Sequence, residues 1–156
     1  MKGEDRRAAG PAKNSEPTLT SSVISIPKRD NRWGDCRYRG NCDGTLFREL
    51  VLRYEPRSVL DPMMGSGTTR DVARELIAGG QRRLRYRGLD LKKGFDILAD
   101  TPDEFFDLVW IHPPYWDIVR YSDDPADLSS YESWDEFRVA LAMALRRCHE
   151  WLAPGG

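Results

Sequence analysis

Apolar residues recur at intervals of three and four in three stretches of the chain, which is the spacing of a helix with one buried face. The first stretch begins at Thr45 and stops at Pro56. The second covers residues 68–78 and is ended by the pair Gly79-Gly80. The third follows Ser133. We therefore expect three helices, all of them after residue 44.

The third helix has the clearest start signal. Ser133 followed by Glu136 is the spacing of a capping box, in which each side chain bonds to the other's main-chain N–H. The helix is expected to end before Pro154. Its predicted apolar face consists of Trp134, Phe137, Leu141, Leu145, Cys148 and Leu152.

Short apolar runs between these helices predict strands at residues 58–61, 84–91 and 108–111, with a shorter piece at 95–98. Because strands alternate with helices, we expect an α/β fold with an open, mostly parallel sheet and helices on both of its faces. Ligand sites in such sheets lie at the carboxyl ends of the strands.

Residues 1–30 show no sustained period and are expected to form a flexible tail, in which residues 23–26 dock as a short strand. Residues 31–156 are expected to form the domain. A chain of 156 residues that is 40% hydrophobic and 31% charged has the composition of one soluble globular domain. It has no apolar run of about 20 residues and no signal-peptide pattern, so we expect a cytoplasmic protein without membrane contact.

The net charge of −1 conceals a polarised chain, since residues 1–93 carry +8 and residues 94–156 carry −9. Arg82, Arg83, Arg85 and Arg87 form a basic cluster that suits either phosphate contacts or a solvated turn, and both interpretations stay open. Three cysteines without a CxxC pair predict reduced thiols and no metal site.

A glycine-rich turn at residues 61–69 lies between a predicted strand and a predicted helix. Gly65 and Gly67 let the main chain turn tightly beside a ligand, but no lysine follows Gly67, so this is not a phosphate-binding P-loop. Asp90, at the end of the next strand, is either a solvated loop residue or an acceptor for two ribose hydroxyls. Together these residues indicate an adenosine-containing cofactor, and S-adenosylmethionine rather than ATP.

A second motif, His112-Pro113-Pro114-Tyr115, follows the last predicted strand. The prolines remove two N–H donors and leave carbonyl oxygens free to face a ligand. Tyr115 and the adjacent Trp116 offer flat faces on which a base can stack. The alternative is a rigid loop with aromatic residues in the core.

The sequence DPMMGSGTT at 61–69, the sequence HPPYW at 112–116 and the sequence YRGN at 38–41 resemble motifs of the amino-group DNA methyltransferases. Members of this family methylate adenine N6 or cytosine N4 from S-adenosylmethionine, and they have a Rossmann-like class I methyltransferase fold. The resemblance spans about residues 32–156. Met63 stands where the family has phenylalanine, which preserves an apolar contact.

The resemblance implies a role for each matching residue. Asp90 would bind the ribose, Asp96 would lie at the adenine, and the segment from Tyr38 through Gly40 to Asn41 would close over the cofactor. The methionine portion would be lined by Asp61, Pro62, Met63, Gly65, Ser66, Gly67 and Thr68.

The resemblance also implies a catalytic motif at residues 112–115. The His112 side chain and the Pro113 carbonyl would accept hydrogen bonds from the amino group, Pro114 would keep the loop rigid, and Tyr115 would stack on a base flipped out of the duplex. The family has Asp, Asn or Ser at the position of His112. A histidine can accept such a bond only when neutral, and the target base does not follow from it.

DNA is the expected partner, with a role in restriction–modification, although the acidic residues Asp123, Asp124 and Asp127 would repel phosphates unless their loop folds away; a solvated lid is the favoured interpretation. tRNA guanine methyltransferases combine similar motifs, so RNA is an alternative substrate. A third hypothesis is a non-catalytic or partner-dependent fragment, because the chain stops at residues 152–156, a helix-ending turn from which this fold would enter its next strand. A second chain or a missing C-terminal segment would then complete the sheet.

Overall fold

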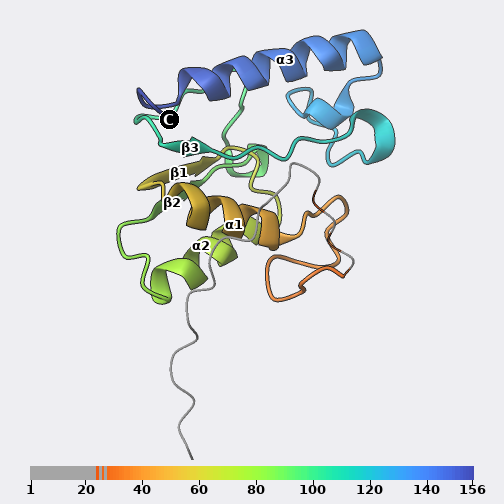
Figure 1. Cartoon of the computed structure of the whole chain (residues 1–156). Coiled ribbons are helices and arrows are strands. Elements are labelled where there is room, and N and C mark those ends of the chain that lie inside the picture. The colour runs from red at the N-terminus through yellow and green to blue at the C-terminus, as the bar shows by residue number, and fades with distance from the viewer. Residues whose placement is uncertain (1–23, 25, 27) are drawn as a thin grey trace, which may run out of the picture.

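The computed structural model describes residues 24, 26 and 28–156, and Figure 1 shows how their elements are arranged. The strands form one parallel sheet in the order β2-β1-β3, which confirms the expected mixed α/β architecture. The helices and strands are α1 (Gly44–Tyr54), β1 (Ser58–Asp61), α2 (Thr68–Ala78), β2 (Arg85–Gly88), β3 (Leu108–Val109) and α3 (Trp134–Glu150). Single 3-10 turns lie at Leu91–Lys93, Trp116–Ile118 and Leu128–Ser130.

β1 is the central strand, and all of its residues are buried. Because successive side chains of a strand point to opposite faces, β1 joins two separate apolar clusters. Val59 packs with Phe47 of α1 and Val72 of α2, whereas Leu60 packs with Phe137 of α3. Figure 1 shows the same division, with α1 and α2 on one side of the sheet and α3 on the other. Helices therefore cover both faces, as expected.

The face that α3 presents to the sheet agrees only in part with the one the sequence predicts, because Phe137 and Cys148 are buried as expected and Leu141 packs against the core. Its buried residues are Phe137, Ala140, Ala144 and Cys148, whereas Trp134 and Leu145 are 52% and 48% exposed. The predicted face was therefore wrong at these two positions. The small alanine side chains let the helix backbone come close to the sheet, and a pattern built on large apolar residues gives alanine too little weight.

The capping box predicted at the start of α3 is also wrong. The Ser133 side chain makes no capping hydrogen bond, and the first turn is closed by the main chain, where the Phe137 N–H donates to the Ser133 carbonyl at 3.0 Å. Two acidic residues, Asp135 and Glu136, lie in this first turn. Their negative charge is favourable beside the unpaired N–H groups at the N-terminal end of a helix.

β2 and β3 are shorter than predicted, and residues 95–98 form no strand, since residues 97–99 form a turn. β2 ends at Gly88, and the carbonyl of the following residue, Leu89, accepts from the N–H of Met64, which lies in the turn after β1, at 3.0 Å. β3 covers only Leu108–Val109. After α3 the chain returns beside the start of β3, through an isolated parallel bridge between residues 106 and 152.

The predicted tail, residues 1–30, falls almost wholly outside the described residues, as do two of the four residues of the strand predicted at 23–26. The other two, Ile24 and Ile26, lie in no strand and are 40% and 36% exposed. Asp30 belongs to the folded part, because its N–H donates to an Asp43 carboxylate oxygen at 2.7 Å. No helix in the described part of the chain is long and apolar enough to cross a membrane.

The N-cap residues of α1 and α3, Asp43 and Ser133, provide a matched test of the fold, because only Asp43 makes a side-chain cap bond. Asp43 caps α1 through Oδ1, which accepts from the Thr45 N–H at 2.7 Å, and its Oδ2 holds Asp30. We expect Asp43→Ala to lower the free energy of unfolding by about 1–2 kcal/mol. Ser133→Ala should lower it by less than about 0.5 kcal/mol, because this side chain makes no cap bond. Urea unfolding measures both, and equal losses would contradict the assignment.

Candidate functional site

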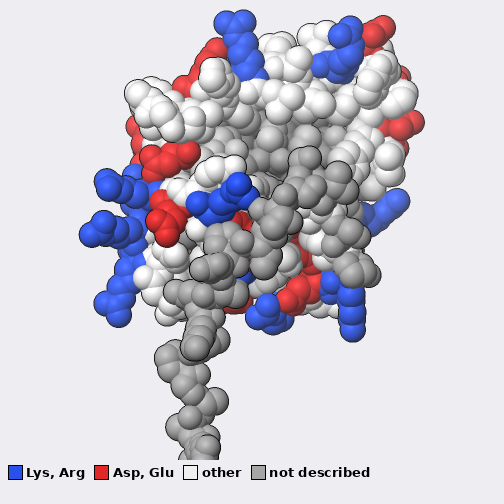
Figure 2. All heavy atoms as spheres, viewed as in Figure 1, with Lys and Arg blue, Asp and Glu red and all other residues white. Residues whose placement is uncertain are grey.

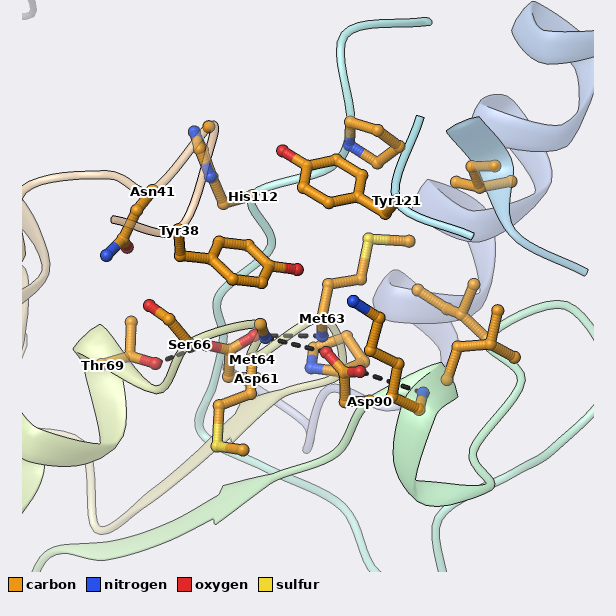
Figure 3. A pocket seen from close by; sticks show the side chains of 18 of the residues that line it. Tyr38, Asn41, Asp61, Met63, Met64, Ser66, Thr69, Asp90, His112 and Tyr121 are labelled. Carbon is orange, nitrogen blue, oxygen red and sulfur yellow. Dashed lines mark hydrogen bonds between the residues drawn. The ribbon is translucent and has the colours of Figure 1, made fainter. Parts of the chain in front are cut away.

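A pocket lies at the carboxyl end of the parallel strands (Figure 3). β1 is flanked there by β2 on one side and β3 on the other, and the chain segments that leave the three strands diverge. Such a divergence is the usual place for a ligand in an open α/β sheet. The sequence-predicted residues that line the pocket are Tyr38, Gly40, Asn41, Asp61, Pro62, Met63, Gly65, Ser66, Thr68, Asp90, His112 and Pro114.

The floor of the pocket is the glycine-rich turn between β1 and α2. Gly65 has a φ of +52°, and a Cβ placed on it would lie 3.4 Å from the ring of Tyr38. Gly67, with a φ of +88°, is the N-cap residue of α2. Both positions therefore need the left-handed backbone region that glycine adopts without strain. At Gly65 the missing side chain also leaves room for the aromatic ring above it.

Asp61 anchors this turn from below and is almost completely buried. Its Oδ2 accepts a hydrogen bond from the Thr69 hydroxyl at 2.5 Å, and its Oδ1 accepts one from the Met63 N–H at 3.0 Å. Tyr86 of β2 extends the network, with its hydroxyl 2.8 Å from that of Thr69. Burial raises the pKa of Asp61 to about 6, although these hydrogen bonds act in the opposite direction.

Asp90, just after β2, connects the glycine-rich turn to the next segment. Its Oδ2 accepts from the Gly65 N–H at 2.8 Å and its Oδ1 from the Lys92 N–H at 3.0 Å. Figure 3 draws both bonds. A carboxylate oxygen has two lone pairs, so each oxygen of Asp90 can still accept a hydrogen bond from a ligand hydroxyl.

Two loops meet over the pocket. The rings of Tyr38 and Tyr121 stack with centroids 5.5 Å apart and planes 14° from parallel. The Tyr121 hydroxyl donates to the Arg39 carbonyl at 3.0 Å, and a Cβ at Gly40 would come within 2.0 Å of that hydroxyl. Gly40 is therefore a glycine because Tyr121 lies against its backbone. Asn41 completes this wall, with its Oδ1 accepting from the Thr68 hydroxyl at 2.6 Å.

His112 follows β3 in the chain and also lines the pocket. It is half-buried, and this burial lowers its pKa below the ordinary 6.5, which favours the neutral ring at pH 7. Its Nε2 lies 2.8 Å from the hydroxyl oxygen of Tyr115. Tyr115 itself is 58% exposed. For Trp116 the core alternative holds, because its indole N–H donates to the Tyr131 carbonyl at 3.2 Å and its ring contacts that of Trp134.

Four predicted site residues do not line the pocket: Gly67, Asp96, Pro113 and Tyr115. Gly67 starts the helix behind the turn. The Asp96 carboxylate accepts from the Leu98 N–H at 2.8 Å, so it caps a local turn. Near the place where Asp96 was expected to meet the adenine, the pocket is lined instead by the apolar neighbours Leu91, Phe95 and Ile97.

Several lining residues were not predicted as site residues from the sequence: Cys42, Met64, Thr69, Leu91, Lys92, Phe95, Ile97, Trp110, Tyr121, Ala126, Asp127 and Leu128. The motif of residues 61–69 pointed to the two that lie within it, Met64 and Thr69. Asp127 belongs to the loop expected to be a solvated lid, but it folds inward, and its carboxylate accepts from the Ser122 hydroxyl at 2.6 Å and the Ser129 N–H at 2.9 Å. Asp123 and Asp124, which are both exposed, fit that expectation.

Two further properties bear on what the pocket can bind. Its lining carries the carboxyl groups of Asp61, Asp90 and Asp127 against the single ammonium group of Lys92. The Ser66 hydroxyl oxygen is buried and has no hydrogen-bond partner in the described residues. Because a buried polar atom without a partner is unfavourable, this hydroxyl is suited to a polar ligand group.

The arginine cluster lies just before and within β2, outside the pocket lining. Arg85 pairs with Glu104 at 2.8 Å, and Arg87 pairs with Asp103. On the face seen in Figure 2, basic and acidic side chains stand next to one another around the rim. Half of the cluster is thus already occupied by carboxylates, which favours the solvated-surface interpretation over phosphate contacts.

No protein-family model, curated protein or solved structure matches this chain. In the part of the chain that the structure describes, no group of three or more His, Cys, Asp or Glu side chains is arranged to hold a metal ion.

Proposed function

We propose that this chain binds S-adenosylmethionine in the pocket and transfers its methyl group to an exocyclic amino group of a base in DNA, adenine N6 or cytosine N4. The fold would then be a Rossmann-like class I methyltransferase fold. One observation carries the proposal: residues of the glycine-rich turn, Asp90, His112 and Pro114 lie far apart in the sequence and line a single pocket.

The charge of the pocket supports this cofactor over a nucleoside triphosphate. S-adenosylmethionine carries a sulfonium, an ammonium and a carboxylate, so its net charge is positive. Three carboxyl groups against one ammonium group attract a cation and repel a polyphosphate. The glycine-rich turn, which has no lysine after Gly67, provides no phosphate clamp.

The residues of the pocket offer a partner for each part of this cofactor. Asp90 has lone pairs left for the ribose hydroxyls, and the apolar side chains of Leu91, Phe95 and Ile97 suit the faces of an adenine ring. The buried Ser66 hydroxyl provides hydrogen-bonding capacity that no described residue uses. These features support binding in the orientation that the motif resemblance implies.

When bound, the cofactor would supply an electrophilic methyl group. The protein's contribution is to present the amine to it. A neutral His112 can accept one N–H hydrogen bond of the amino group, which directs the nitrogen lone pair away from the ring and raises its nucleophilicity. Pro113 and Pro114 have no main-chain N–H groups, so neither can donate a hydrogen bond to the lone pair of the amine nitrogen. Holding the two reactants at the right distance provides most of the acceleration in such a transfer.

Two measurements test the proposal. Isothermal titration should show binding of S-adenosylmethionine and of its demethylated product, and no binding of ATP. Methyl incorporation from labelled cofactor should then occur into duplex DNA and not into tRNA, and His112→Ala should reduce it by about 100-fold or more. His149→Ala, on the exposed surface of α3, is the matched control. Incorporation into tRNA alone would favour the RNA alternative, and a folded protein that binds neither cofactor form would refute the proposal.

A further inference from the structure

Tyr115 occupies a position that differs from the stacking role implied by the resemblance. Its ring does not line the pocket and is 58% exposed. Its hydroxyl oxygen lies 2.8 Å from Nε2 of His112, and the two rings meet edge to face with centroids 5.6 Å apart. Tyr115 therefore contacts the proposed amine acceptor through its hydroxyl group.

This contact limits the chemistry of the imidazole. Neutral histidine has two ring nitrogens, one of which carries the proton while the other has a free lone pair. Because Tyr115 uses Nε2, Nδ1 is the nitrogen left to face a ligand. The direction of the Tyr115 bond then decides what Nδ1 can do: a Tyr115 that donates leaves an N–H at Nδ1, and a Tyr115 that accepts leaves a lone pair there.

We infer that Tyr115 is a positioning residue whose hydroxyl oxygen accepts a hydrogen bond from the Nε2–H of His112, so that the Nδ1 lone pair is the acceptor offered to the amino group of the target base. This inference rests on the proposed function for the identity of the target, and on the His112–Tyr115 geometry for the tautomer. Tyr115 would then act by orienting His112 and not by stacking on the base.

Two features support this direction. Tyr115 is exposed, so its own hydroxyl proton can be donated to water while the oxygen accepts from His112. His112 is half-buried, and the burial that lowers its pKa keeps the ring neutral and able to retain one lone pair. The opposite direction would place an Nδ1–H against the N–H groups of an amine, donor against donor, and would oppose methyl transfer.

Nuclear magnetic resonance of the full chain tests the tautomer without any substrate. The protein has only two histidines, and His149→Gln assigns their signals. Long-range ¹H–¹⁵N spectra at pH 7.5 should show the proton of His112 on Nε2. In Tyr115→Phe, which keeps the ring and removes the hydroxyl, the two nitrogen shifts of His112 should move toward each other as the tautomers mix. A proton on Nδ1 in the wild type, or unchanged shifts in Tyr115→Phe, would overturn the inference.

Kinetics separate positioning from stacking. A phenylalanine stacks on a base as well as a tyrosine does, so a stacking residue would tolerate Tyr115→Phe, whereas the loss of one positioning hydrogen bond should lower kcat about tenfold and leave KM for S-adenosylmethionine unchanged. Tyr54→Phe, an exposed tyrosine on α1, is the control. Full activity of Tyr115→Phe would refute the inference. A wild type with the Nε2–H tautomer but without methyl transfer would instead refute the proposed function.

Discussion

Replacing Gly65 by arginine is expected to raise the Kd for S-adenosylmethionine by more than about 100-fold, a loss of about 2.7 kcal/mol of binding free energy. The reason is geometric. A Cβ at Gly65 would already contact the ring of Tyr38, so any longer side chain must enter the pocket or displace that ring. The same change disturbs the Gly65 N–H that donates to Asp90. Isothermal titration measures the loss.

The control for this variant is Gly155→Arg. Gly155 also has a positive φ, +88°, but a Cβ there meets nothing within 4 Å. Both variants should lose roughly 1–2 kcal/mol of stability, because each places a side chain in the left-handed backbone region. Only Gly65→Arg should lose binding. If the two variants bind the cofactor equally well, the pocket is not the cofactor site.

The stability of the protein is expected to depend on pH through Asp61. Burial raises its folded-state pKa from 3.8 to about 6, so between these values the folded state holds a proton that the unfolded chain releases. The sign follows from linkage: the favourable contribution is fully present below pH 3.8 and is lost as the pH rises through 6. At about 1.36 kcal/mol per pKa unit, ionisation of Asp61 removes about 3 kcal/mol by pH 7.

Asp61→Asn isolates this contribution from those of other carboxyl groups. The amide oxygen can still accept from the Met63 N–H, and the amide NH₂ can donate to the Thr69 hydroxyl oxygen, so the network can be kept. Urea unfolding of both proteins at a series of pH values should show the wild type losing about 3 kcal/mol relative to the variant as the pH rises from 3 to 7. A constant difference would show that Asp61 titrates normally and is not desolvated.

Much of the fold followed from local patterns. The helix predicted over residues 68–78 and the strand predicted over 58–61 have the predicted bounds in the structure, because each combines a clear apolar period with a proline or glycine boundary. α3 shows where this approach fails. Its length was predictable from its boundaries, but its buried face was predicted only in part, since packing against the sheet favoured Ala140 and Ala144 over the larger Trp134 and Leu145.

In the candidate site, too, one part could be predicted from the sequence and another part depended on the tertiary structure. The sequence alone indicated which segments carry candidate site residues, because the glycine pair, Asp90 and the His-Pro-Pro-Tyr segment are recognised by residue type and by their places after predicted strands. The tertiary structure alone decided which side chains share the pocket. It brought in Tyr121 and Asp127, turned Asp96 to a local cap, and set the Tyr115 hydroxyl on His112. The physical reason is that side-chain direction and contacts between distant loops depend on packing of the whole chain, which no local pattern contains.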